Sequence, residues 1–277
     1  MVETGTMNTL VVCRTSPYGT FLEGGDHGEI MLLKESPAVA RAPGDKIDVF
    51  VYVDSDDTLL ASVTRPAIVA GECGALTVSA LTDSGAFLDW GMKSDLFVPR
   101  SHQMGDMAVG QRCVVMALVD ELNGRMIGTT RLYDYLEDEN AGDFKSGQKV
   151  ELLICQETDL GYKAVIDGTH LGVIYRGEIF QPIAIGDQLP GYIKEARSDL
   201  KIDLALQLHN PEARTEIEAK ILQHLKKNNG ESTLTDKSRP EDIYRTFNVS
   251  KKVYKHALGA LYRNRLILLT KEKVSLV

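Results

Sequence analysis

An internal repeat constrains the fold of this chain more than any other feature. A glycine that follows a strand pattern occurs at Gly19, Gly85 and Gly161, and a second glycine follows each of them after the same interval of 25 residues. The second glycines, each of which opens another strand pattern, are Gly44, Gly110 and Gly186. Because the interval recurs three times, the sequence predicts three consecutive copies of one small domain.

Each copy has the strand and turn pattern of a small barrel. In the first copy, Ile47, Val49, Val51 and Val53 alternate with the residues of the opposite face, which is the period of a β-strand. Polar turns separate such runs, so that each copy contains about five predicted strands in roughly 65 residues. A five-stranded barrel of the OB type fits this count and leaves no exposed sheet edge.

The last part of the chain has the periodicity of helices. Apolar residues at helical spacing predict a first helix over residues 212–226. A proline followed by two acids predicts a second helix over 240–247, and Ser250 is expected to cap a third helix over 251–264. A β-hairpin pattern follows at 267–276, and three helices with a terminal hairpin predict a winged helix.

These patterns together predict a mainly β chain, with three tandem five-stranded OB-fold barrels followed by an α+β winged-helix domain. The expected limits are 1–66, 67–142 and 143–208 for the barrels and 209–277 for the winged helix. The acidic segment 133–142 is expected to be a partly helical or extended linker.

Charge is unevenly distributed along the chain. Residues 1–208 contain 17 Lys and Arg against 31 Asp and Glu, a balance of −14, whereas residues 209–277 contain 14 against 8, a balance of +6. A polyanion is therefore expected to approach the C-terminal domain. The alternative is that a basic domain complements an acidic neighbour in the same chain.

The basic residues of the last domain are predicted to gather on one surface. Most lie opposite the apolar stripe of the third predicted helix, and two lie at the tip of the hairpin. The predicted phosphate-contacting residues are Lys251, Lys252, Lys255, His256, Arg263, Lys271 and Lys273. A basic third helix with a basic hairpin is how winged helices contact phosphates, and this clustering favours nucleic-acid binding over an ordinary solvated face.

Aromatic and basic residues near the repeat glycines are the predicted base-contacting residues of the barrels. OB barrels bind single strands by stacking bases on exposed aromatic rings beside a basic groove. The residues are Tyr18 and Phe21 in the first copy, Phe87 and Trp90 in the second, and Tyr162, Lys163, Tyr175 and Arg176 in the third. For any one of the aromatic rings, packing in a core is the alternative.

These positions resemble the S1 RNA-binding domain, whose strand motif is an aromatic, a glycine, a small residue and a second aromatic. The resemblance covers residues 7–208 as three copies, of which the first keeps both aromatics. With the winged helix added, the domain order resembles the conserved virulence factor B family of bacterial S1 proteins, most specifically at 44–54 and 254–262. The resemblance implies RNA binding, an influence on gene expression after transcription, and no catalytic site.

Other kinds of chemistry have little support in the sequence. The four cysteines are widely separated, which is typical of reduced thiols in a cytosolic protein, so a cytoplasmic location is expected. The six histidines lack metal-ligand spacing, and no nucleophile motif occurs. No apolar run reaches the ~18 residues that span a bilayer. We therefore expect no enzyme activity, cofactor, metal or membrane partner.

Three functions follow from these patterns. The leading hypothesis is that the winged helix and the third barrel bind single-stranded RNA, with help from the aromatic residues of the first barrel. The second is a winged-helix transcriptional regulator that binds duplex DNA in a major groove. The third is a protein-interaction scaffold in which the acidic barrels contact other proteins.

Overall fold

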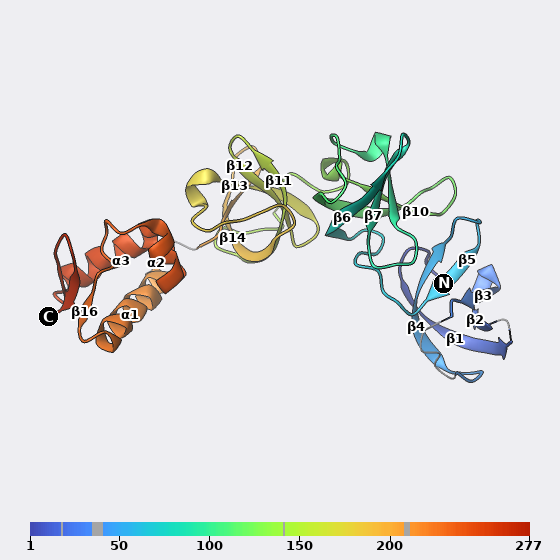
Figure 1. The fold of residues 1–277 in the computed structure, drawn as a ribbon, viewed down its shortest axis with the longest axis horizontal. Helices are drawn as coiled ribbons and strands as arrows, with labels where there is room; N and C mark the ends of the chain where they lie inside the picture. The colour runs from blue at the N-terminus through green and yellow to red at the C-terminus, as the bar shows by residue number, and fades with distance from the viewer. Residues whose placement is uncertain (18, 35–40, 141, 208–210) are drawn as a thin grey trace. The chain divides into compact units, whose positions relative to one another are not determined.

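The computed structural model describes residues 1–17, 19–34, 41–140, 142–207 and 211–277. Within these residues the chain is mainly β, with three closed five-stranded barrels followed by a small winged-helix region with three helices (Figure 1). This architecture confirms the predicted fold class. The chain divides into two compact units, Met1–Leu136 and Glu137–Val277. The first unit contains two barrels, and the second contains the third barrel and the winged helix.

The three barrels share one strand order. The first contains β1 (Met7–Ser16), β2 (Gly19–Glu23), β3 (Glu29–Leu32), β4 (Lys46–Val53) and β5 (Leu59–Ser62). The second contains β6 (Cys73–Leu81), β7 (Gly85–Asp89), β8 (Leu96–Pro99), β9 (Arg112–Val119) and β10 (Met126–Thr129). The third contains β11 (Lys149–Thr158), β12 (Gly161–Ile166), β13 (His170–Tyr175), β14 (Gln188–Ala196) and β15 (Ile202–Ala205). In each, the strands neighbour one another in the order first, second, third, fifth, fourth, and the fourth closes onto the first.

The first strand of every barrel has a bulge at the same place. The register shifts at Cys13 in β1, at Ser79 in β6 and at Cys155 in β11, each six residues before the repeat glycine. A bulge bends its strand and increases the local twist, which a small barrel needs in order to close. The repeat seen in the sequence is therefore also a repeat in backbone geometry.

Close packing of neighbouring strands explains why glycine is needed at two of the repeat positions. A Cβ at Gly85 would overlap the carbonyl oxygen of Val98 on the neighbouring strand, and a Cβ at Gly161 would overlap that of Ile174. Glycine is the residue that allows a backbone to approach so closely.

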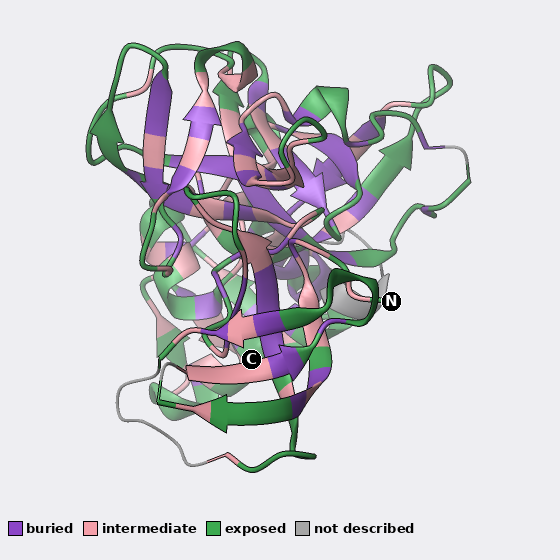
Figure 2. Cartoon of the chain, turned by 90° about the vertical axis from the view of Figure 1, so that its right-hand side faces the viewer, coloured by how far each residue is buried: buried purple, intermediate pink, exposed green. Residues whose placement is uncertain are grey.

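The barrel interiors are filled by the alternating apolar residues that the sequence predicted. In β4, Val49 and Val51 are fully buried, and Ile47 is half-buried against the same core. Buried and exposed segments alternate along the barrel strands in Figure 2. The alternation confirms that one face of each strand lies inside its barrel.

The outer face of β4 packs against the second barrel. Phe50 is 0% exposed and lies edge-on to Trp90, with ring centroids 5.8 Å apart. Phe50 also stacks on Tyr52 at 5.4 Å. From the second barrel, the Arg125 guanidinium donates to the Asp57 carboxylate at 2.7 Å and to the Ser55 carbonyl at 2.8 Å, both in the turn after β4. The first two barrels thus share one buried cluster.

The acidic segment predicted to be a linker is packed along much of its length. It begins in a 3₁₀ turn, Leu132–Asp134, and Leu136 is buried. The backbone of Glu137 then pairs with the third barrel, because its carbonyl accepts from the Leu171 N–H at 2.8 Å. Asn140 is buried and its amide donates to the Phe144 carbonyl at 2.9 Å. The segment expected to be a partly helical or extended linker is thus packed against the third barrel at 137–140.

The winged helix consists of α1 (Pro211–Lys227), β16 (Glu231–Ser232), α2 (Pro240–Phe247), α3 (Lys251–Arg263), β17 (Ile267–Leu269) and β18 (Val274–Leu276). The three helices and the hairpin lie within one or two residues of their predicted bounds. The strand β16, which pairs with β18, was not predicted. None of the described helices has the length and apolar character needed to cross a membrane.

A buried tyrosine lies at the centre of this domain. Tyr254 is 1% exposed, stacks on Phe247 and donates its hydroxyl hydrogen to the Leu234 carbonyl at 2.9 Å. Ala257, Leu258 and Leu261 of α3 are buried in the same core.

Candidate nucleic-acid interface

The start of α3 is held by specific hydrogen bonds. The Ser250 hydroxyl accepts from the Val253 N–H at 3.2 Å, which is the predicted N-cap. Asn248 ends α2 in the left-handed conformation, with φ 55°. Gln207, just after β15, donates to the Asn248 carbonyl at 2.9 Å and accepts from the Ser250 N–H at 3.0 Å. The side chain of Gln207 therefore holds the turn between α2 and α3 through two hydrogen bonds to its backbone.

One face of α3 presents cations to solvent. Lys252, Lys255, His256 and Arg263 are exposed, and Lys251 is half-buried. Within the described part of the chain, none of these five side chains pairs with a carboxylate. The helix itself contains no acidic residue. Its positive charge is consequently available to an external anion.

The two cations of the hairpin differ in their surroundings. Lys271 is exposed and has no carboxylate partner among the described residues. Lys273 pairs with Glu231 at 2.6 Å, and both side chains remain about half exposed. Exposed pairs of this kind contribute at most about 1 kcal/mol, so an anion can compete for Lys273.

A hollow of about 190 Å³ lies beside the first turn of α3. It is lined on one side by Lys251 and Lys252 and on the other by 177–180 of the third barrel. Phe180 contacts Tyr244 of α2, with ring centroids 5.8 Å apart. The third barrel thus contributes surface next to the cations of α3.

In the first barrel, Phe21 is half-buried and lies under an arginine. The Arg14 guanidinium carbon is 3.8 Å from the centroid of the Phe21 ring, within the range of a cation–π contact. Arg14 also pairs with Glu29 at 2.7 Å, and this hydrogen bond raises the pKa of Arg14 and lowers that of Glu29. Tyr18, the other predicted aromatic, lies outside the described residues.

In the second barrel, the two predicted aromatics have different environments. Phe87 is half-buried and its ring contacts Phe97, with centroids 5.1 Å apart. Trp90 is 4% exposed, and its indole N–H donates to the Ser94 carbonyl at 2.6 Å. Because the Trp90 ring is enclosed by Phe50 and the core of the second barrel, its prediction as a base-stacking residue is wrong in this structure.

In the third barrel, Tyr162 and Lys163 lie on β12 and are half-buried, with Tyr162 packed against the core. Arg176 donates to the carbonyls of Asp159 and Thr158, both at 3.1 Å, and pairs with Glu157 at 3.6 Å. Arg176 and Glu157 both remain more than half exposed, so the RNA contact predicted for Arg176 stays a prediction.

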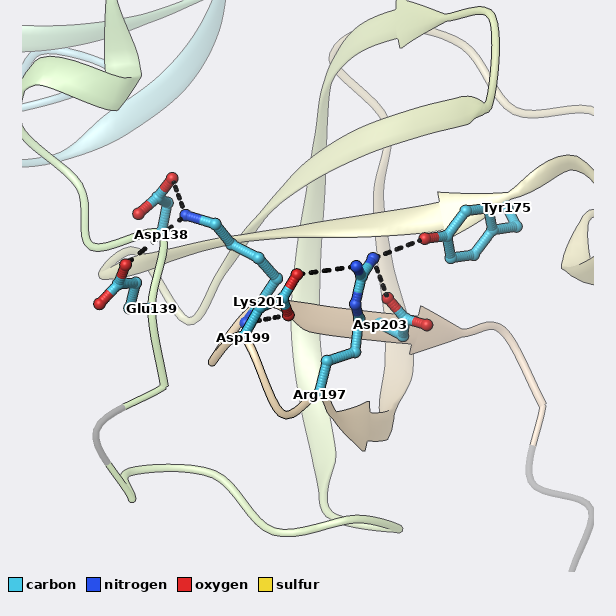
Figure 3. Close-up of polar contacts among 7 residues, drawn as sticks. All are labelled: Asp138, Glu139, Tyr175, Arg197, Asp199, Lys201 and Asp203. Atoms are coloured by element: carbon cyan, nitrogen blue, oxygen red, sulfur yellow. Dashed lines mark hydrogen bonds and ion pairs between the residues drawn. The ribbon is translucent and has the colours of Figure 1, made fainter.

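A polar network occupies the surface around Tyr175 (Figure 3). The Tyr175 hydroxyl accepts a hydrogen bond from Arg197 at 3.2 Å. Arg197 also pairs with Asp199 at 2.7 Å and with Asp203 at 3.9 Å. The charge of Asp199 raises the pKa of Arg197, and burial raises the pKa of Asp203. Lys201, in the same strand-turn segment, pairs with Asp138. Internal carboxylates thus neutralise the cations of this region.

Three cations near the candidate surfaces were not predicted. Arg14 covers Phe21, and Lys237 and Arg239 lie in the loop that precedes α2. Arg14 had a weak signal in the sequence, because it lies in the strand that pairs with Phe21. Lys237 and Arg239 lie outside any helical or strand pattern, so periodicity gave no reason to select them.

Comparison with known proteins identifies domains at both ends of the chain. Residues 219–276 match a CvfB-like winged helix domain, and residues 4–64 match an S1 domain. Uncharacterized protein YitL of Bacillus subtilis is 27% identical over 273 residues, which cover 94% of this chain and 89% of the relative. Conserved virulence factor B of Staphylococcus epidermidis is 24% identical over 276 residues, which cover 93% of this chain and 89% of the relative.

A solved structure also matches along the whole chain. It is the crystal structure of a multidomain protein with nucleic acid binding domains from Streptococcus pneumoniae, 21% identical, with a TM-score of 0.45. The match covers 99% of this chain and 98% of the other.

The fold and the matched domains place the chain in a class: it is a multidomain protein built from S1 and winged-helix domains, which are nucleic-acid-binding types. The matches also confirm the resemblance predicted from the sequence. In the order of its domains, the chain is similar to proteins of the conserved virulence factor B type.

Proposed function

We propose that this protein is a non-catalytic regulator that binds single-stranded RNA and acts on gene expression after transcription. In this proposal, the cations of α3 and the hairpin bind the phosphates of the strand. The third barrel borders the same surface, and the half-buried ring of Phe21 in the first barrel stacks with a base. The nucleic-acid-binding types of the domains support the general class of ligand.

The observation that carries the proposal is the unmatched positive charge of α3. The chain is acidic as a whole, with a net charge of −8, and several of the barrel arginines pair with carboxylates of the same chain. Among the residues that the structure describes, Lys252, Lys255 and Arg263 have no carboxylate partner, and they extend from a helix without an acidic residue. Neutralising phosphates with such cations releases counterions, which is the main source of affinity for nucleic acids.

Single-stranded RNA is preferred over duplex DNA because of the barrels. OB barrels bind unpaired strands, whose bases can stack on aromatic rings. Phe21 is such a ring on β2, and the Arg14 guanidinium lies over one of its faces. A regulator that used only a winged helix in a major groove would have no need of this feature.

The test is a binding titration of the full-length protein with a fluorescently labelled, unstructured RNA, followed by anisotropy. The variant combines Lys252→Glu with Lys255→Glu, and both residues are exposed, so the fold should be unaffected. The matched control combines Lys226→Glu with Lys227→Glu, two exposed lysines at the end of α1 that carry the same change in net charge. Melting curves verify that both variants fold.

We expect the α3 variant to lose at least two phosphate contacts. For a single strand this loss lowers the slope of log K against log salt by about 1.4. The control should bind nearly as well as the unmodified protein. Equal affinities for the α3 variant and the control would remove the proposed interface. Stronger binding to a duplex DNA competitor than to RNA would instead favour a DNA-binding regulator, and negligible binding to both at low salt would favour a protein scaffold.

A further inference from the structure

The winged-helix domain contains a second surface that could receive an anion, and it is separate from α3. A hollow of about 770 Å³ lies between the end of α1, strand β16, the loop before α2, the exposed side of α2 and Lys273 of the hairpin. None of the predicted α3 cations lines it. Its volume is in the range of ligand-binding pockets, which is roughly 300–1,000 Å³.

Positive charge exceeds negative charge around this hollow. Its lining includes four formal cations, on Lys237, Arg239, Arg245 and Lys273, and two carboxylates, on Glu231 and Asp242, which leaves a balance of +2. This excess occurs in a chain whose net charge is −8. A hollow with this balance attracts an anionic group rather than a neutral one.

The two carboxylates are already paired, and two of the cations are not. Glu231 pairs with Lys273 at 2.6 Å, and Asp242 pairs with Arg245 at 3.8 Å. Lys237 and Arg239 are exposed, and neither pairs with a carboxylate within the described ranges. The unmatched charge of the hollow is therefore located on Lys237 and Arg239.

The remaining lining is mostly polar. Thr233, Ser238, Thr246, Asn228 and His224 also line the hollow. The Ser232 hydroxyl lies 3.3 Å from His224 Nε2. Hydroxyl and amide groups commonly complete the contacts that arginine and lysine make with phosphate oxygens.

We propose that this hollow is a second phosphate-binding site, in which Lys237 and Arg239 bind the phosphodiester backbone of a nucleic-acid strand that also contacts α3. The inference rests on the proposed RNA-binding function. Lys273 connects the two surfaces, because it belongs to the hairpin and also lines the hollow. The winged helix then binds the strand at two places, α3 and the hollow. Two separate contacts fix the orientation of the strand on the domain better than one.

The test uses the full-length protein and the same labelled RNA over a series of salt concentrations. The variant combines Lys237→Gln with Arg239→Gln. The matched control combines Lys226→Gln with Lys227→Gln, which removes the same charge from the same domain at positions that do not line the hollow. Loss of two phosphate contacts should lower the slope of log K against log salt by about 1.4, which is about 25-fold in affinity per tenfold change in salt. The control should retain the full slope.

Each outcome decides between the two proposals. If the variant and its control have the same slope, the hollow is not part of the interface, and this inference fails even when the Lys252 and Lys255 variant has lost binding. If that α3 variant keeps its affinity while Lys237 and Arg239 prove necessary, the proposed function must be moved to the hollow. Inorganic phosphate could raise the melting temperature of the unmodified protein but not that of the Lys237 and Arg239 variant. If the slope for RNA were also unchanged in that variant, the hollow would be a site for a small phosphorylated ligand, and the proposal that it binds an RNA strand would be overturned.

Discussion

Replacing Phe50 by alanine tests whether the first two barrels depend on each other for stability. Phe50 belongs to the first barrel through β4, but its ring is fully buried in the cluster that contains Trp90 and the core of the second barrel. Truncating a buried Phe to Ala costs about 3–5 kcal/mol. With a urea m-value of about 2 kcal/mol per molar, this loss lowers the unfolding midpoint by about 1.5–2.5 M.

The assay uses the fluorescence of Trp90, which is the single tryptophan of the chain and reports on the second barrel. We expect Phe50→Ala to lower the urea midpoint of this signal, even though the substitution lies in the other barrel. Phe21→Ala is the matched control, because Phe21 is in the first barrel but outside the shared cluster. It should leave the Trp90 midpoint almost unchanged. A Phe50→Ala midpoint equal to that of the unmodified protein would refute the coupling.

Two further predictions concern the RNA contact of the first barrel and the thiols of the second. Phe21→Ala should weaken single-stranded RNA binding by about 1–3 kcal/mol, or about 5- to 150-fold, because a stacked base is lost. Trp90→Phe should leave affinity unchanged in the same anisotropy titration, and the reverse result would contradict the assignment of the two rings. Burial raises the pKa of Cys73 to about 12 and that of Cys113 to about 11 from a usual 9.0, so both thiols ionise first in the unfolded chain. Their stabilising effect is complete below pH 9 and is lost above it by about 1.4 kcal/mol per thiol and pH unit. The urea midpoint of the Trp90 signal should therefore decrease as the pH is raised from about 9 to 10.5, and the double variant Cys73→Ala, Cys113→Ala should show a smaller decrease. Equal decreases in the variant and the unmodified protein would contradict this prediction.

Repeats and periodicity were sufficient to predict the architecture. Three intervals of equal length required three similar domains, and the alternation in β4 identified its inner face. Proline, acidic residues and Ser250 marked the starts of α2 and α3, since these residues act locally on the helix ends. Because these signals act between residues that are close in the chain, they can be recognised in a single sequence.

Contacts between residues far apart in sequence were not predictable in the same way. Alternation shows that Phe50 points out of its own barrel, but it does not show whether that side faces water or the second barrel. Trp90 was assigned to base stacking for the same reason. Likewise, a count of charges cannot show that Arg125 pairs with Asp57, 68 residues away, whereas the lysines of α3 have no such partner within the described residues.

The distribution of paired and unpaired cations suggests how the two kinds of domain divide the work of binding RNA under the proposed function. The barrels are acidic, and Arg14, Arg125 and Arg176 are engaged with internal carboxylates, so their contribution to affinity has to come mainly from aromatic stacking. Stacking releases few counterions and changes little with salt. The cations of α3 act through counterion release, which weakens steeply as salt rises. The affinity that remains at high salt should consequently belong to rings such as Phe21, and the part that salt removes should belong to the winged helix.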